Sequence, residues 1–154
     1  MTLSRTAVAV AAAILIAMPA EGLRQFAYYD PPGILSVCYG STTDVKSGRR
    51  YSLEECRDRL NQDMRQAVAT VERCAPGAPL NVLTAFADAV YNIGPKIVCD
   101  VRQSKAARYL QASQWMAACR ELTKWDKAKV AGVMVPLPGL TKRRAVERSV
   151  CELA

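Results

Sequence analysis

Apolar and polar positions follow three different patterns along the chain. Residues 6–20 form an uncharged apolar run that begins directly after Arg5. Residues 26–43 are rich in aromatic and β-branched side chains around two prolines and a glycine, which predicts a small hairpin or irregular sheet. From Ser52 onward apolar residues recur at intervals of three and four, the period of helices that bury one face.

The longest of these helical patterns begins at Ser52. Ser52 and Glu55 match a capping box, and apolar residues continue at helical spacing as far as Val71. Residues 81–92 are apolar on most sides, as expected of a buried central helix. Three further helices, each opening with a hydroxyl residue as a cap, are predicted at about 104–111, 113–125 and 141–152, and residues 130–140, with two prolines, are predicted to be a connecting loop.

A short β element followed by helices predicts an α+β fold. The 154 residues suit one compact domain, and no internal repeat or linker marks a second. The chain contains no histidine, which excludes Ser-His-Asp and Cys-His catalysis and the zinc sites that use histidine. We therefore expect any catalysis by this chain to use carboxylates or hydroxyls.

The net charge of +7 favours an anionic partner such as nucleic acid, phospholipid or a cell-wall polymer. The basic residues are spread over many segments and aromatic residues make up only 6% of the chain. Because no nucleic-acid-binding motif accompanies the charge, we expect no nucleic-acid partner.

The apolar run after Arg5 is typical of an export signal. Its fifteen residues span only about 22 Å as a helix, short of the roughly 30 Å hydrocarbon core, so it would be a poor permanent anchor. One interpretation is an ordinary signal peptide cleaved after Ala20. The other is a segment that remains attached.

Six cysteines lie after this segment and none within it, which indicates disulfides in an oxidising compartment. A metal site is the competing interpretation, but the sequence contains no C-x-x-C pair. Six cysteines allow about 15 pairings, so cysteine spacing alone does not determine the connectivity.

Candidate chemistry follows the apolar run directly. Glu21 and Asp30 stand at the end of a helical pattern and at the start of a turn, and Ser36 follows in the predicted hairpin. Glycoside hydrolysis needs such a set, with one carboxyl as a general acid and another that activates water or attacks. By themselves, two carboxylates at this spacing occur often by chance, and solvated surface charges are their usual explanation.

Glu21, Gly22, Tyr28, Asp30 and Ser36 match the pattern E-G-x5-Y-x-D with a following hydroxyl. In this respect the chain resembles the phage-type lysozymes of glycoside hydrolase family 24, and more narrowly the signal-arrest-release endolysins of lambdoid-like phages. The resemblance runs from about residue 21 to 151 and also includes C-Y-G-S-T at 38–42, F-A-D-A-V-Y-N-I-G at 86–94, Trp125 and G-L-T-K-R-R-A-V-E at 139–147.

The resemblance implies a lysozyme-like fold, mostly helical, with a small β-hairpin lobe, a helical lobe and the active-site cleft between them. It implies that Glu21 is the general acid, that Asp30 orients or deprotonates the attacking water, and that Ser36 helps to hold that water. The implied substrate is the β-1,4 bond between N-acetylmuramic acid and N-acetylglucosamine in peptidoglycan, cleaved with inversion by a monomer without cofactor or metal. For inversion we expect the carboxyls of Glu21 and Asp30 to lie roughly 6.5 to 9.5 Å apart.

Two positions depart from the family, which usually has threonine at Ser36 and often histidine at Ser41. Serine keeps the hydroxyl but lacks the methyl group that restricts its rotamer, so we expect activity to survive, at a reduced level. The resemblance also suggests the disulfides Cys38–Cys56 and Cys119–Cys151, which leaves Cys74–Cys99 as the remainder.

Cleavage after Ala20 would place an α-ammonium group beside a carboxyl that has to hold a proton, and it would remove the helix that positions Glu21. We therefore expect residues 1–20 to be a signal-arrest-release segment, and residues 21–154 to be the catalytic domain.

The segment would tether the protein to the host inner membrane facing the periplasm, in an inactive state. Release to the periplasm would follow collapse of the membrane potential by a phage holin or pinholin. No cysteine lies in residues 1–20, so a disulfide exchange from this segment is unavailable.

Two alternatives stay open at this point. A non-catalytic exported wall-binding or immunity protein of the same fold would use Glu21 and Asp30 only as surface charges. A lytic transglycosylase would need one catalytic acid and would leave an anhydro end on its product.

Overall fold

The computed structural model describes residues 2–153, and over these residues it is mostly helical with two small hairpins. The elements are α1 (Arg5–Glu21), β1 (Arg24–Tyr29), β2 (Leu35–Cys38), α2 (Leu53–Cys74), α3 (Leu80–Ile93), α4 (Lys96–Cys99), α5 (Lys105–Gln111), α6 (Trp115–Glu121), a 3-10 turn (Leu122–Lys124), β3 (Lys127–Val130), β4 (Val133–Pro136) and α7 (Pro138–Cys151). This order confirms the predicted α+β fold.

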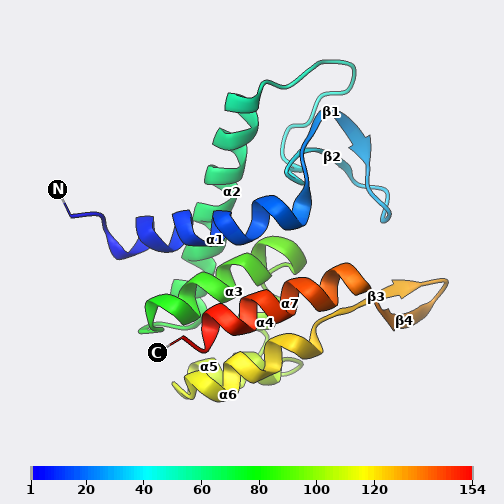
Figure 1. The fold of residues 1–154 in the computed structure, drawn as a ribbon. Helices are drawn as coiled ribbons and strands as arrows, with labels where there is room; N and C mark the ends of the chain where they lie inside the picture. Colours follow the sequence, from blue (N-terminus) through cyan, green and yellow to red (C-terminus); the bar gives the residue numbers. More distant parts are fainter. Residues whose placement is uncertain (1, 154) are drawn as a thin grey trace.

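The elements form two lobes joined by α2 (Figure 1). The antiparallel β1–β2 hairpin and the loop after it form a small lobe at the start of α2. From there α2 runs into a helical lobe, in which α3 contacts α1 on one side and α7 on the other. Ser52 caps α2 with the predicted capping box, since its Oγ accepts from the Glu55 amide and the Glu55 carboxylate accepts from the Ser52 amide.

Helix α1 packs into the helical lobe through small side chains. Ala9, Ala13 and Ala17, spaced one helical turn apart, are fully buried in the core. Alanine at these positions leaves room for α1 to lie against α2 and α3, both of which it contacts. Its opposite face is open, and Leu15 is 74% exposed. Within residues 2–153, no helix has both the length and the hydropathy to cross a membrane.

The structure corrects the prediction of a loop at 130–140. Strands β3 and β4 form a hairpin that projects from the body (Figure 1), with Val130 paired to Val133 around Ala131 and Gly132. Both central residues have positive φ, 50° and 82°, as the tight hairpin turn requires. Alanine rarely adopts this conformation, so the sequence carries no standard signal for the turn.

Two predicted helix starts were also wrong. Helix α7 begins at Pro138 rather than at residue 141, because proline suits the first helical position, where no amide hydrogen is needed. Helix α6 begins at Trp115, since Ser113 has a φ of 55° and does not act as its cap. The chain also leaves α-helical geometry after Glu121 and continues as the 3-10 turn.

Three disulfides connect the elements: Cys38–Cys56, Cys74–Cys99 and Cys119–Cys151. They coincide with the pairing suggested from the sequence. The first joins β2 to α2, the second joins the end of α2 to α4, and the third joins α6 to α7. Because the first links the hairpin lobe to α2, it also fixes the strand that carries Ser36.

Candidate active site

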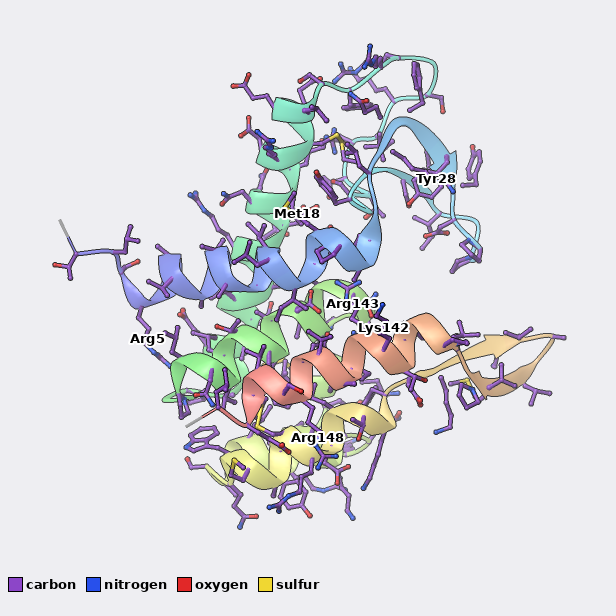
Figure 2. The ribbon with its side chains drawn as sticks, in the orientation of Figure 1. Arg5, Met18, Tyr28, Lys142, Arg143 and Arg148 are labelled. Carbon is purple, nitrogen blue, oxygen red and sulfur yellow. A yellow bond between two sulfur atoms is a disulfide. The ribbon has the colours of Figure 1, made fainter. Side chains whose placement is uncertain are left out.

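Glu21 is the last residue of α1, and its carboxyl lies between that helix and α7. Gly22, with a φ of 71°, ends the helix and donates its amide hydrogen to the Met18 carbonyl at 3.3 Å. The Glu21 Oε1 accepts from Nη1 of Arg143 at 2.5 Å, and the Glu21 side chain remains 21% exposed. Figure 2 shows Arg143 on α7, on the side that faces α1. Glu21 is therefore both held by a cation and accessible to solvent.

A glycine closes the other side of Glu21. Gly40 follows β2 with a φ of 92°, and a Cβ atom built on it would lie 3.3 Å from Oε2 of Glu21. Tyr91 of α3 lies at the same place and donates to the carbonyl of Tyr39. Burial, assisted by the nearby Glu21 carboxylate, raises the pKa of Tyr91, so its hydroxyl remains a donor. The turn after β2 thus passes close to the Glu21 carboxyl, and glycine at position 40 leaves room for it.

Asp30 and Ser36 lie together across the β1–β2 turn. The Asp30 Oδ1 accepts from the Ile34 amide at 2.7 Å, which fixes the orientation of the carboxylate. Its Oδ2 lies 3.5 Å from Oγ of Ser36, and that hydroxyl is also within 3.2 Å of the Ile34 carbonyl. Ser36 is 2% exposed, so its hydroxyl is held in place, and Asp30 is half-buried.

Glu21 and Asp30 thus lie beside the same short segment, because Asp30 is within 3.5 Å of Ser36 and a Cβ atom at Gly40, four residues later, would lie 3.3 Å from Glu21. Two cavities lie near Glu21. A groove of about 780 Å³ between α1 and α7 reaches Glu21 itself, and a hollow of about 270 Å³ is lined by Gly40 and Tyr91. Asp30 and Ser36 line neither of these two.

Ser41, where the family often has histidine, has a charged partner from α2. Nη1 of Arg59 donates to the Ser41 hydroxyl at 3.2 Å and to the Thr43 carbonyl at 2.6 Å. Burial raises the pKa of Asp63, while a hydrogen bond from Ser41 opposes that shift. Arg59 and Asp63 of α2 therefore contact the hairpin lobe at Ser41, the position at which the family often has histidine.

The prediction from sequence did not single out the groups that support Glu21. Arg143 appeared only within the motif at 139–147, and Asp88 only within the motif at 86–94. Both of the Asp88 carboxylate oxygens accept from Arg143, at 2.8 and 2.9 Å. The sequence did contain one signal for Asp88, because it is the one charged residue in a helix that was predicted to be buried. A fully buried acid requires a charged or hydrogen-bonding partner, and Asp88 is 0% exposed.

Comparison with known proteins identifies the family. Residues 18–147 match the phage lysozyme family. The chain is 34% identical over 136 residues to an endolysin of Acyrthosiphon pisum secondary endosymbiont phage 1, covering 87% of this chain and 90% of that protein. It is 33% identical over 145 residues to the SAR-endolysin of Pseudomonas phage phiKMV, covering 93% and 88% of the two chains.

Among solved structures, the muramidase domain of SpmX from Asticaccaulis excentricus superposes with a TM-score of 0.81 at 28% identity, covering 94% of this chain and 96% of that one. This similarity confirms the predicted lysozyme-like fold. Together with the sequence matches, it shows that the chain belongs to the phage lysozyme family, whose members are glycoside hydrolases of peptidoglycan.

Proposed function

We propose that Glu21, Asp30 and Ser36 carry out the peptidoglycan hydrolysis of this lysozyme. Glu21 protonates the glycosidic oxygen, and Asp30 orients or deprotonates the attacking water, which Ser36 helps to hold. The main support is that both acids lie beside β2 and the turn after it: Oδ2 of Asp30 is 3.5 Å from Oγ of Ser36, and a Cβ atom at Gly40 would lie 3.3 Å from Oε2 of Glu21. Oδ1 of Asp30 accepts from the Ile34 amide at 2.7 Å and Oδ2 lies 3.5 Å from the Ser36 hydroxyl, so in this proposal the water binds at Oδ2, beside Ser36.

The substrate bond in this proposal is the β-1,4 linkage between N-acetylmuramic acid and N-acetylglucosamine. Peptidoglycan is anionic, and the net charge of +7 favours its binding. With a water molecule between Asp30 and the sugar, the reaction inverts the anomeric centre.

Product stereochemistry tests this mechanism. Proton NMR during the first minutes of digestion is expected to show the α-anomer of the new reducing end, before mutarotation mixes the two anomers. An initial β-anomer would indicate a covalent intermediate on Asp30. An anhydro end would indicate a transglycosylase. Either result contradicts the proposed role of Asp30.

We further propose that residues 1–20 stay attached and regulate the enzyme. While they hold the chain in the host inner membrane, α1 is withdrawn from α3 and Glu21 is separated from Arg143 and Gly40. Release to the periplasm, after a holin or pinholin collapses the membrane potential, lets α1 pack and completes the site. The burial of Ala9, Ala13 and Ala17 and the SAR-endolysin relative support this proposal.

The mature N-terminus tests this regulation. Mass spectrometry of active protein from the periplasm is expected to show a chain that still contains residues 6–20. Before the membrane is depolarised, the same intact chain is expected in the membrane fraction. A mature N-terminus at Glu21 in active protein contradicts the proposal, because α1 would then be absent from the working enzyme.

A further inference from the structure

The β3–β4 hairpin projects from the helical lobe (Figure 1) and lines neither of the two cavities near Glu21. From the end of β3 to the end of β4, residues 130–136 contain no polar side chain. Three of them are nevertheless largely exposed, Val133 by 61%, Met134 by 56% and Val130 by 50%. Single exposed apolar residues are common, but a contiguous group on a projecting element is typical of a binding surface.

The tip of this hairpin is apolar on both faces. Val130 is paired with Val133, and Lys129 with Met134. Because paired residues of an antiparallel hairpin share a face and successive residues alternate, the two valines lie on one face and Met134 lies on the other. A protein partner would cover one face and leave the other in water. The hydrocarbon of a bilayer surrounds such a tip and covers both faces.

The cations of the hairpin lie behind its tip. Lys127 and Lys129 are exposed on β3, and Lys142 is exposed near the start of α7, the helix that follows β4. Lys127 pairs with Asp126 at 3.7 Å, whereas Lys129 and Lys142 have no ion pair within residues 2–153. Residues 128–146 contain no acid. The hairpin and its base therefore complement an anionic surface.

Strand geometry places the apolar and the basic side chains at different depths. The turn begins at Ala131, two residues beyond Lys129, and a strand rises about 3.3 Å per residue. The tip therefore extends roughly 7 Å past the backbone of Lys129. Interfacial segments bury their apolar groups by roughly 5 to 10 Å at the boundary between headgroups and acyl chains. At that depth the long stem of Lys129 lets its ammonium group reach the phosphates.

We propose that the β3–β4 hairpin binds the surface of a membrane that contains anionic phospholipids, with its tip among the acyl chains and its lysines at the phosphates. Nucleic acids and glycans offer anionic groups without hydrocarbon, so neither would cover Val133 and Met134. Under the regulation proposed above, this contact holds the released enzyme at the bilayer after α1 has packed. The contact itself does not depend on the roles of Glu21 and Asp30.

Vesicle binding by the full chain tests this surface. Val133→Thr/Met134→Gln nearly keeps the shape of the tip and makes it polar. In co-sedimentation with vesicles of mixed phosphatidylethanolamine and phosphatidylglycerol, we expect this variant to bind about tenfold more weakly than wild type, because less apolar surface leaves water. The matched control Leu53→Thr/Met116→Gln alters apolar side chains of similar exposure, 49% and 48%, on α2 and α6. It is expected to bind as wild type does.

A charge variant separates the hairpin from α1, which the proposed regulation also places in a bilayer. Lys129→Gln is expected to bind the anionic vesicles about fivefold more weakly than wild type, and vesicles of phosphatidylcholine equally well. Residues 6–20 carry no charge, so insertion of α1 does not depend on the charge of the lipid. Lys105→Gln, which removes an exposed lysine of α5, is the control and is expected to bind both vesicles as wild type does.

Equal binding of wild type and Val133→Thr/Met134→Gln to the anionic vesicles overturns the proposal, because α1 or diffuse charge then accounts for the binding. Absence of binding by wild type overturns it too. Purified peptidoglycan sacculi, which contain no lipid, are the third probe, and the tip variant is expected to bind them and to clear permeabilised cells as wild type does. Loss of either property, with thermal unfolding unchanged, would assign the hairpin to glycan binding instead. Because the vesicle assay needs no turnover, it separates failure of this proposal from failure of the role assigned to Glu21.

Discussion

Replacing Glu21 with glutamine is expected to slow the clearing of permeabilised Gram-negative cells by about a thousandfold, within the range measured for loss of a general acid. Glutamine has nearly the same shape, and its oxygen still accepts from Nη1 of Arg143, so the contact with α7 is preserved. What it lacks is the proton for the leaving oxygen. Turbidity loss measures the rate, and thermal unfolding checks that the fold is intact.

Asp58→Asn is the matched control. Asp58 is an exposed acid on α2, and its replacement removes the same charge at a distance from Glu21. We expect it to clear cells at the wild-type rate. Equal clearing by wild type and Glu21→Gln would contradict the catalytic assignment and favour the wall-binding alternative, in which Glu21 is only a surface charge.

A chain that begins at Glu21 is expected to lose both cooperative unfolding and activity. It lacks α1, and with it buried Val10 and Ile16, whose removal from the core costs about 3 to 6 kcal/mol together. That is a large part of the roughly 5 to 15 kcal/mol that stabilises a domain. The new α-ammonium would also lie beside the Glu21 carboxyl. Circular dichroism during heating and turbidity loss measure the two effects.

A chain that begins at Ser4 is the control for this truncation. It keeps the N-cap, whose Oγ accepts from the Ala7 amide at 3.1 Å, and every buried residue of α1, and it loses only residues that precede the helix. We expect wild-type unfolding and activity from it. If the chain beginning at Glu21 instead folds and clears cells as fast as this control, residues 1–20 are not part of the working enzyme.

The sequence by itself determined the features that depend on neighbours a few residues away. The capping box at Ser52 and Glu55, the cap of α5 at Ser104 and the apolar period of α2 were all read correctly, because their interactions close within one helical turn. The motif from Glu21 to Ser36 is local in the same sense, since one hairpin brings Asp30 to Ser36. These features established the α+β fold and the candidate acids.

Only the tertiary structure decided what surrounds those acids. Arg143 reaches Glu21 across 122 positions of sequence, and it does so because α1 and α7 both pack near α3. The burial of Asp88, whose two carboxylate oxygens accept from Arg143, exists only once those helices have assembled. Electrostatic effects of this kind depend on distance in space and on exclusion of water, and neither is encoded in spacing along the chain.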